Sequence, residues 1–446
     1  MPFFSSRPAL DQLPGFALPA DSLQTLHSAA AFRHTLLALI RGASRRIHLA
    51  ALYLQQDEGG AEILQALYDA ARSKPQLDIR IFVDAHRAQR GLIGQGRQAG
   101  NAAWYRSLAE QQPLTNLAIY GVSVQSKELF GVMHLKGFVI DDQVLYSGAS
   151  LNNVYLHVGE RYRFDRYHLL QHAALADSLS HYLVSQLATD PAVIRLDRPI
   201  QLDRRQQRRE IKQFRSKLAQ AGYRLPGAPD GTPSIHPLCG QGRGNAFNRQ
   251  LLQLLRDTRR QLTICTPYFN LPRPVLQQID RLLQQGVTVE IIVGDKEAND
   301  FYIPPEQPFK IIGCLPYLYE MNLRRFARKR QGYIASGQLC LRLWRHEANS
   351  YHLKGLWLDQ RYMLITGNNL NPRAFNLDLE NGLLIHDPQQ QLATQRDAEL
   401  AAIREHTRVL QHYRELQKLH DYPEKVRKLL GRLGKLRIDR LFYRLL

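Results

Sequence analysis

Two segments of the chain carry residue types that together can act on a phosphodiester. Each segment has the pattern H-x-K-x-x-x-x-D, and each is followed by G-x-x-x-N. The residues concerned are His134, Lys136, Asp141 and Asn152 in the first half and His352, Lys354, Asp359 and Asn371 in the second half. Chance easily produces one copy of such a pattern, whereas two copies in the same order indicate a functional unit.

The spacing of each histidine and lysine predicts a shared orientation. In an extended strand, the side chains at positions i and i+2 lie on the same face. His134 and Lys136 are then expected to project into one cleft, which the amide of Asn152 also reaches. Each half thereby supplies a nucleophile, a positive charge and a neutral hydrogen-bond donor, the groups that a phosphodiester reaction needs.

Two such half-sites facing one another predict a histidine on either side of one phosphorus atom. An imidazole with a pKa of about 6.5 can serve as a neutral nucleophile or as a protonated acid. We expect the two lysines and the two asparagines to bind the non-bridging oxygens, so that neither a metal ion nor another cofactor is required. A lone histidine on an apolar strand is more often a core residue, and the duplication argues against that interpretation here.

Four carboxylates accompany the two motifs. Asp141 and Asp359 complete the H-x-K-x-x-x-x-D pattern and count among the catalytic candidates, although an aspartate at a strand end more often makes a salt bridge or turn hydrogen bonds. Asp165 and Glu380 lie downstream of the motifs. We expect these two to orient the imidazoles through their Nδ1 atoms.

The elements around the motifs also occur twice, which indicates an internal repeat. Apolar and alternating stretches predict a strand, a helix and a second strand in each half, at 47–54, 60–72 and 77–83 and at 262–269, 274–285 and 287–293. A strand-helix-strand unit favours parallel pairing with a crossover. The expected fold is therefore α/β, with two pseudo-symmetric lobes that each hold a mostly parallel or mixed sheet flanked by helices.

Changes in composition suggest the boundaries between these units. A basic run begins at Arg204, and Pro226 to Pro233 cannot sustain a helix or a strand. We expect a first lobe at 1–200, a linker at 201–235, a second lobe at 236–392 and a basic, helical C-terminal extension at 393–446. The basic run is interpreted as a solvated helix face in preference to a specific anion site.

Composition limits the class of protein. The chain has 446 residues, of which 44% are hydrophobic and 22% charged, and this balance is typical of a folded globular protein. Its four cysteines form no C-x-x-C pair and suggest neither disulfides nor a zinc cluster. The formal net charge of +19 favours polyanionic partners, either nucleic acid or anionic lipid. The charge alone leaves that choice open.

Two stretches are candidates for contact with a lipid surface. Residues 423–446 place leucines near helical spacing between lysines and arginines, which predicts a basic amphipathic helix on anionic lipid or a helix packed on the body of the protein. Residues 311–319 are apolar and aromatic and precede a basic cluster, although such a run is more often core followed by an exposed helix. No run reaches the length of a membrane span, so any contact with a bilayer is expected from its side.

The motifs resemble those of the phospholipase D superfamily, whose members carry two H-K-D motifs in two pseudo-symmetric α/β lobes. Further stretches resemble one branch of it, the CDP-diacylglycerol–serine O-phosphatidyltransferases (phosphatidylserine synthases) of Gram-negative bacteria. These stretches are Ala51–Leu54, Val83–Asp84, His86–Gly91, Tyr146–Asn152, Thr266–Pro272, Asp300–Pro304 and Gly367–Ala374. Many superfamily members have a serine directly after the motif glycine, where this chain has Ala149 and Asn368, so hydroxyl contacts to phosphate are not expected there.

The resemblance implies a two-step phosphatidyl transfer with CDP-diacylglycerol and L-serine as substrates. His134 is the expected nucleophile and His352 the expected acid that protonates the departing CMP and later deprotonates serine, in preference to the reverse assignment, which stays open. Lys136, Lys354, Asn152 and Asn371 would bind the phosphate. The expected location is the cytoplasm, at the inner face of the cytoplasmic membrane, with secondary binding to ribosomes or RNA left open.

Other functions remain compatible with the same residues. The nearest are a cardiolipin synthase and a phosphodiesterase or nuclease, because the same half-sites would act on those substrates. A nucleic-acid-binding protein without catalysis would explain the charge but gives no reason for paired His-x-Lys segments. A metal-dependent CDP-alcohol transferase would need a D-x-x-D-G acidic cluster, which the sequence lacks.

Overall fold

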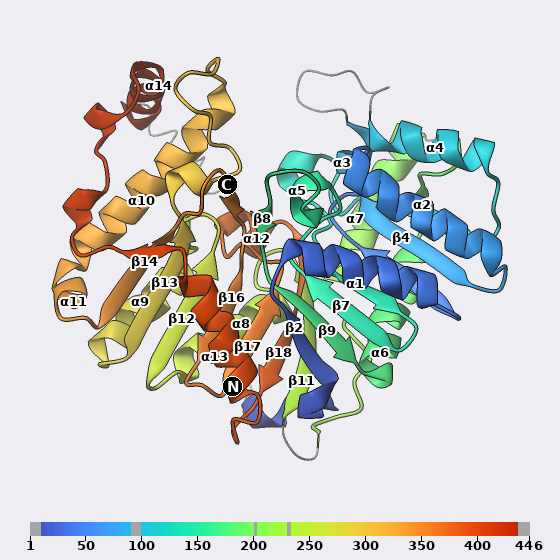
Figure 1. The fold of residues 1–446 in the computed structure, drawn as a ribbon, viewed down its shortest axis with the longest axis horizontal. Coiled ribbons are helices and arrows are strands. Elements are labelled where there is room, and N and C mark those ends of the chain that lie inside the picture. The colour runs from blue at the N-terminus through green and yellow to red at the C-terminus, as the bar shows by residue number, and fades with distance from the viewer. Residues whose placement is uncertain (1–9, 91–99, 200–202, 230–232, 436–446) are drawn as a thin grey trace, which may run out of the picture.

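Two mixed β-sheets meet at the centre of the molecule in a computed structural model that describes residues 10–90, 100–199, 203–229 and 233–435 (Figure 1). In these residues the first sheet has the order β10 (Ile194–Arg195), β5 (Leu117–Val122), β4 (Asp78–Asp84), β3 (Arg46–Ala50), β6 (Gly137–Ile140), β7 (Gln143–Ser147), β9 (Tyr167–Gln171) and β2 (Leu23–Leu26). The second has the order β1 (Phe16–Ala17), β11 (Ser234–Gln241), β18 (Leu379–His386), β17 (Tyr362–Thr366), β16 (Gly355–Leu358), β12 (Gln261–Thr266), β13 (Thr288–Gly294), β14 (Leu339–Trp344) and β19 (Thr407–Val409). The expectation of an α/β fold with two related sheets is confirmed.

The predicted repeat unit is present in both halves. Helix α2 (Glu58–Ser73) connects the parallel strands β3 and β4, and α9 (Arg273–Gln284) connects the parallel strands β12 and β13. Strands β5 and β14 extend these parallel pairs. The strands on the other side of β3 and β12, beginning with β6 and β16, pair antiparallel, so each sheet is mixed.

Apolar side chains cover both faces of each sheet. Helices α1 (Ala29–Gly42) and α2 lie on the outer face of the first sheet, where Phe32, Leu36 and Ile63 pack against its strands. Helices α8 (Ala246–Asp257) and α9 cover the outer face of the second sheet in the same way. The inner faces share one apolar cluster, in which Val139 and Tyr146 of the first sheet join Trp357 and Ile365 of the second. This shared core fixes how the two halves dock.

The two halves also exchange short segments. Strand β1, near the start of the chain, pairs with β11 of the second sheet, although β2 pairs within the first. A separate two-stranded parallel sheet joins β8 (Arg163–Phe164) of the first half to β15 (Ser350–Tyr351) of the second. The β8–β15 pairing places Asp165, which follows β8, close to His352, which follows β15.

The predicted linker, 201–235, contains a packed helix. Helix α7 (Arg204–Leu218) begins at the basic run, and its apolar residues Ile211, Phe214 and Leu218 are buried against strands of both halves. Its arginines Arg205 and Arg208 are exposed, as a solvated helix face requires. The part of the proline- and glycine-rich stretch at 230–232 lies outside the described residues.

The remaining helices flank the sheets and the segments between them. They are α3 (Ala85–Gln89), α4 (Asn101–Gln111), α5 (Asn153–Leu156), α6 (Ala173–Tyr182), α10 (Leu315–Lys329), α11 (Gln331–Ala335), α12 (Pro372–Asn376), α13 (Ala393–Arg404) and α14 (Glu424–Lys435). Strand β19, between α13 and α14, pairs antiparallel with β14, so the segment after residue 393 also adds an edge strand to the second sheet. The sequence analysis did not predict this strand.

The described part of the basic C-terminal segment packs on the protein. In α14, Val426 and Leu430 are buried against Tyr317 and Leu318 of α10. This contact matches the packed alternative for 423–435 and also makes most of the apolar run 311–319 part of a core. Residues 436–446 of the predicted membrane-surface helix lie outside the described residues. Within the described ranges, no helix is both long enough and apolar enough to cross a bilayer.

Candidate active site

Each H-x-K segment is extended and is held by the opposite half of the chain. The backbone N–H of His134 donates to Leu379 O at 2.9 Å, and the N–H of Lys136 donates to the Asn381 side-chain oxygen at 2.9 Å. In the second half, the N–H of His352 donates to Phe164 O at 2.9 Å. The side chains of each pair therefore share a face, as the i and i+2 spacing predicts.

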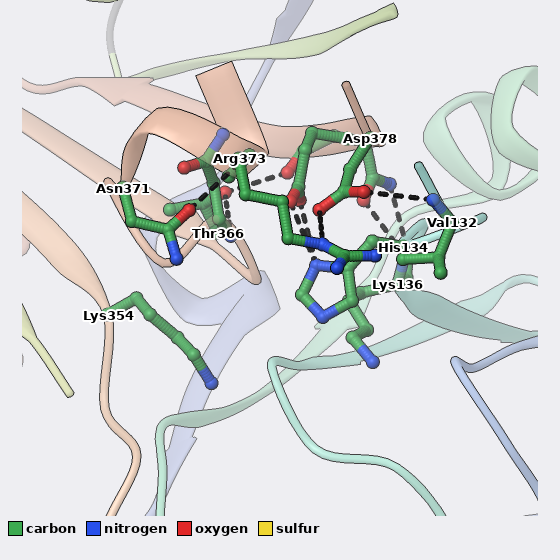
Figure 2. A network of polar contacts seen from close by, with 12 residues as sticks. Val132, His134, Lys136, Lys354, Thr366, Asn371, Arg373 and Asp378 are labelled. Carbon is green, nitrogen blue, oxygen red and sulfur yellow. Dashed lines mark hydrogen bonds and ion pairs between the residues drawn. The ribbon is translucent and has the colours of Figure 1, made fainter. Parts of the chain in front are cut away.

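The strands begin later than the sequence indicates. Strand β6 begins at Gly137 and β16 at Gly355, so His134, Lys136 and their counterparts precede the sheets. The reason is that the backbone groups of these residues pair with the other half rather than with a neighbouring strand of their own sheet. Figure 2 shows Lys354 and Asn371 of the second half directed toward the space that His134 of the first half faces.

The carboxylates beside the imidazoles are exchanged between the halves. Nδ1 of His134 lies 3.0 Å from both carboxylate oxygens of Glu380. Nδ1 of His352 lies 3.5 Å from Asp165 and 2.9 Å from the hydroxyl of Tyr155. Because Nδ1 is engaged in both rings, Nε2 is the nitrogen positioned for chemistry.

The lysines cross between the halves as well. Lys354 Nζ lies 2.9 Å from Asp165 and also contacts His352 Nδ1. A Cβ at Gly148, the glycine of the first G-x-x-x-N, would lie 2.9 Å from that Nζ. In the mirrored arrangement, a Cβ at Gly367 would lie 2.6 Å from Cγ of Lys136. Each motif glycine thus leaves room for the lysine of the other half.

We expect Gly148→Ala to reduce activity strongly. The new Cβ would also lie 2.8 and 2.9 Å from the Asp165 carboxylate oxygens, so the buried Asp165–Lys354 pair must shift. A displacement of about 1 Å at reacting groups lowers the rate roughly 100-fold, and overpacking costs about 1–3 kcal/mol of unfolding free energy. Turnover and thermal unfolding measure the two effects. Gly42→Ala, at the end of α1 with nothing within 4 Å of its new Cβ, is the matched control and should change neither by much.

Electrostatics favour neutral imidazoles before substrate arrives. Burial, followed by the charges of Lys136, Lys354 and His352, lowers the pKa of His134 well below its ordinary value. Burial and then Lys354 lower the pKa of His352 to about 4. Charged groups of the second half therefore shift the pKa of His134 in the first half, as expected if both half-sites face one substrate.

The pKa values of the two carboxylates beside the imidazoles shift in opposite directions. Burial and then the neighbouring Asp378 raise the pKa of Glu380 well above its usual range. Burial also opposes ionisation of Asp165, but Lys354 and His352 outweigh it and hold the pKa of Asp165 below its ordinary value. The ionised carboxylate beside His352 stabilises an imidazolium there in preference to His134.

Asn152 and Asn371 each cap a helix that follows the motif. The side-chain oxygen of Asn152 accepts from the N–H of Tyr155 at 3.2 Å, and that of Asn371 accepts from the N–H of Ala374 at 2.8 Å. With the oxygen used as the cap, the amide nitrogen is the end that can donate to a phosphate. Capping therefore also sets the orientation of the amide.

Asp141 and Asp359 do not join the other motif residues. Asp141 accepts backbone hydrogen bonds from Ser44, Arg45 and Arg46 at the start of β3. Asp359 accepts from the N–H groups of residues 259–261 at the start of β12. Both lie beyond the far ends of β6 and β16, where they organise the turn before the neighbouring strand. We assign them a structural role.

The sequence analysis missed several residues that hold the site together. Asn381 binds the backbone of Lys136 on both sides, since its nitrogen also donates to Lys136 O at 2.8 Å. Asp378 accepts from the N–H of Val132 at 2.9 Å and from Arg373 at 3.2 Å (Figure 2). Local spacing gives no signal for the contacts of Asn381 with Lys136 and of Asp378 with Val132, because those partners are about 245 residues apart.

Within the described part of the chain, no three histidine, cysteine, aspartate or glutamate side chains are grouped so that they could hold a metal ion. Besides the carboxylates that contact the imidazoles, the polar groups that converge on the site are two imidazoles, two ammonium groups and two amides. This set is suited to an anionic phosphodiester, since lysines and amides donate to phosphate oxygens and a histidine can act as nucleophile.

Comparison with known proteins supports this chemistry. A family described as "Cardiolipin synthase, PLD-like domain" matches residues 36–161 and 251–406. The chain is 50% identical over 438 residues to the CDP-diacylglycerol–serine O-phosphatidyltransferase PssA of Escherichia coli (strain K12), which covers 98% of this chain and 97% of that protein. It is also 50% identical over 438 residues to the CDP-diacylglycerol–serine O-phosphatidyltransferase of Haemophilus influenzae, with 97% and 96% covered.

One solved structure has the same fold as this chain. The crystal structure of phosphatidylserine synthase from Haemophilus influenzae Rd KW20 matches with a TM-score of 0.95 at 49% sequence identity, and the match covers 98% of both chains. The matched family spans both H-x-K segments, and the fold brings these segments together from its two halves. The chain therefore belongs to the phospholipase D-like family.

Proposed function

We infer that this chain transfers the phosphatidyl group of CDP-diacylglycerol to L-serine and releases CMP. The observation that carries this inference is the 50% identity, over nearly the whole of both chains, to two CDP-diacylglycerol–serine O-phosphatidyltransferases. The facing histidines and lysines supply the chemistry that such a transfer needs.

In the first step, Nε2 of His134 attacks the phosphorus that bears diacylglycerol, and the bond from that phosphorus to the CMP oxygen breaks. Lys136 and Lys354 stabilise the charge that develops on the non-bridging oxygens. His352 donates a proton to CMP, because the ionised Asp165 and the bound anion both favour its imidazolium form. The products are CMP and a phosphatidyl group bound covalently to His134.

In the second step, the serine hydroxyl takes the place that CMP has left. His352, now neutral, accepts the hydroxyl proton while the serine oxygen bonds to phosphorus. The bond from phosphorus to His134 breaks, and phosphatidylserine leaves. Both steps use the same charges on the non-bridging oxygens, and each restores the protonation state that the other requires.

The direct test is incubation of the purified protein with CDP-diacylglycerol and labelled serine. We expect release of CMP and appearance of label in phosphatidylserine, with CMP release accelerated by serine. A cardiolipin synthase would instead turn over a glycerol-bearing lipid, and a nuclease would cleave DNA without CDP-diacylglycerol. Either of those outcomes without transfer to serine would overturn the proposal.

The pH dependence of substrate binding follows from Lys136. Burial and then Lys354 lower the pKa of Lys136 to about 7, so its ammonium is fully present below that pH and is lost above it. We expect the KM for CDP-diacylglycerol to rise as the pH increases through about 7. Lys136→Arg keeps its charge to a pH above about 12, so its KM should lose this rise whatever its absolute activity. Parallel KM profiles for the two proteins would contradict the prediction.

We further propose that the protein works at an anionic membrane surface on the cytoplasmic side. Lys425, Arg427, Lys428 and Arg432 are exposed on α14, whose apolar residues face the protein. Ile311, at the start of a turn that contacts α14, is exposed and adds an apolar contact. Basic side chains contribute about 1 kcal/mol each near anionic lipid.

Replacing the four basic residues of α14 by glutamine should therefore reduce cosedimentation with phosphatidylglycerol vesicles and leave the fold intact. Undiminished binding would contradict this assignment.

A further inference from the structure

A buried ion pair lies beside the imidazole of His352. Asp300 follows β13 in the second half, and Arg163 belongs to β8 in the first. Arg163 Nε lies 3.0 Å from Asp300 Oδ1, and the two side chains are only 17% and 9% exposed. The guanidinium also lies over the ring of Tyr155, 4.6 Å from its centre. Like the orienting carboxylates, this pair joins the two halves of the chain.

Asp300 is positioned at the reactive nitrogen of His352. Its Oδ2 lies 3.9 Å from Nε2, whereas Tyr155 and Asp165 occupy the opposite side of the ring at Nδ1. The hydroxyl of Tyr268 donates to the same Oδ2 at 2.8 Å and fixes the carboxylate. A group bound at His352 Nε2 is therefore next to a carboxylate.

Asp300 carries a charge and has unused hydrogen-bonding capacity. Burial opposes its ionisation, but Arg163 and His352 outweigh it and hold the pKa of Asp300 below its ordinary value. Oδ1 is buried and, apart from its ion pair with Arg163 and the Ser350 hydroxyl close to the same carboxylate, accepts no well-directed hydrogen bond from the described residues. Buried polar atoms normally have such a partner. This atom is thus suited to a donor from outside the protein.

In the first half-site, the carboxylates near His134 are occupied by contacts within the protein. Asp84, which ends β4, accepts from the backbone N–H groups of Arg87 and Met133. Asp378 accepts from the Val132 N–H and pairs with Arg373. These carboxylates hold the chain around His134 in place. The asymmetry matches a reaction in which only His352 activates an acceptor.

We propose that Asp300 and Arg163 form the subsite for the amino-acid acceptor. Asp300 binds the α-ammonium group and Arg163 binds the α-carboxylate, so that the hydroxyl of a zwitterionic serine lies at Nε2 of His352. This assignment rests on the proposed function. The hydroxyl proton passes to Nε2, the serine oxygen bonds to phosphorus and the bond between phosphorus and His134 breaks. A guanidinium has five N–H donors, so Arg163 can hold the serine carboxylate while it keeps Asp300.

The test compares acceptors that lack one charge each. With Asp300→Asn we expect the KM for L-serine to rise roughly 30-fold, since removing one partner of a buried charge contact has an effect of this size. The preference for serine over glycerate, which has no ammonium group, should fall by a similar factor. With Arg163→Gln the preference for serine over ethanolamine, which has no carboxylate, should fall instead. Serine-independent release of CMP in a single turnover should decline less in Asp300→Asn than turnover with serine does.

Two results would overturn the proposal. One is an unchanged KM for serine and an unchanged acceptor preference in Asp300→Asn. The other is a loss of CMP release in Asp300→Asn that is as large without serine as with it, because Asp300 would then only orient His352. If Asp300→Asn does not fold, Tyr268→Phe provides the test. Loss of the hydroxyl that holds the Asp300 carboxylate in place should raise the KM for serine several-fold. Asp280→Asn, in a half-exposed ion pair with Arg330, is the matched control. Failure of the proposed function is separate, since it would appear in the unaltered protein as absence of transfer to serine.

Discussion

Replacing His134 by alanine should abolish CMP release and leave no phosphatidyl group attached to the protein. The imidazole is the proposed nucleophile, and loss of a nucleophile lowers turnover on the order of 10⁴-fold or more. The measurement is intact-protein mass, or retained label, after brief reaction with CDP-diacylglycerol labelled in the lipid. His34→Ala, an exposed histidine on α1, should behave like the unaltered protein.

His352→Ala should give the complementary result. Loss of the acid slows formation of the intermediate by about 10²–10⁴-fold, and loss of the base slows its transfer to serine as well. The covalent phosphatidyl group should therefore form slowly and persist in this variant even with serine present. If label is instead retained by His134→Ala and not by His352→Ala, the two histidines have the opposite roles.

Replacing Lys354 by methionine should lower both stability and activity. Lys354 and Asp165 are 0% and 1% exposed, so the substitution leaves a buried carboxylate without its ammonium partner. Breaking such a pair costs about 3–5 kcal/mol of unfolding free energy. Activity should fall by about 10²–10³-fold, because the ammonium also stabilises charge on the phosphate. Denaturant unfolding and kcat/KM measure the two effects.

A second substitution separates the effect on stability from the effect on activity. Asp165→Asn in the Lys354→Met background removes the unpaired charge and should recover stability, whereas activity should stay low. Arg72→Met is the control, since Arg72 pairs with Asp69 and the two side chains are 54% and 59% exposed. An exposed pair contributes about 0–1 kcal/mol. Recovery of activity in the double variant would show that Lys354 acts only through Asp165.

The sequence by itself determined the composition of the site and the elements that support it. The duplicated H-x-K and G-x-x-x-N patterns identified His134, Lys136, His352, Lys354 and their asparagines, because strand geometry places residues i and i+2 on one face. The repeated strand-helix-strand order predicted the two related sheets, since hydrophobic periodicity reports local structure directly. Residues in strong local patterns are therefore those that the sequence can indicate as candidates.

The tertiary structure alone decided which half completes each half-site. Glu380 contacts His134, Asp165 contacts His352, and Gly148 makes room for Lys354, in each case across nearly 190 residues or more. It also placed Asp141 and Asp359 at distant turns and folded the first part of α14 onto α10. These arrangements follow from how the inner faces of the two sheets dock. Docking depends on the shape and packing of surfaces assembled from the whole chain, which local periodicity does not encode.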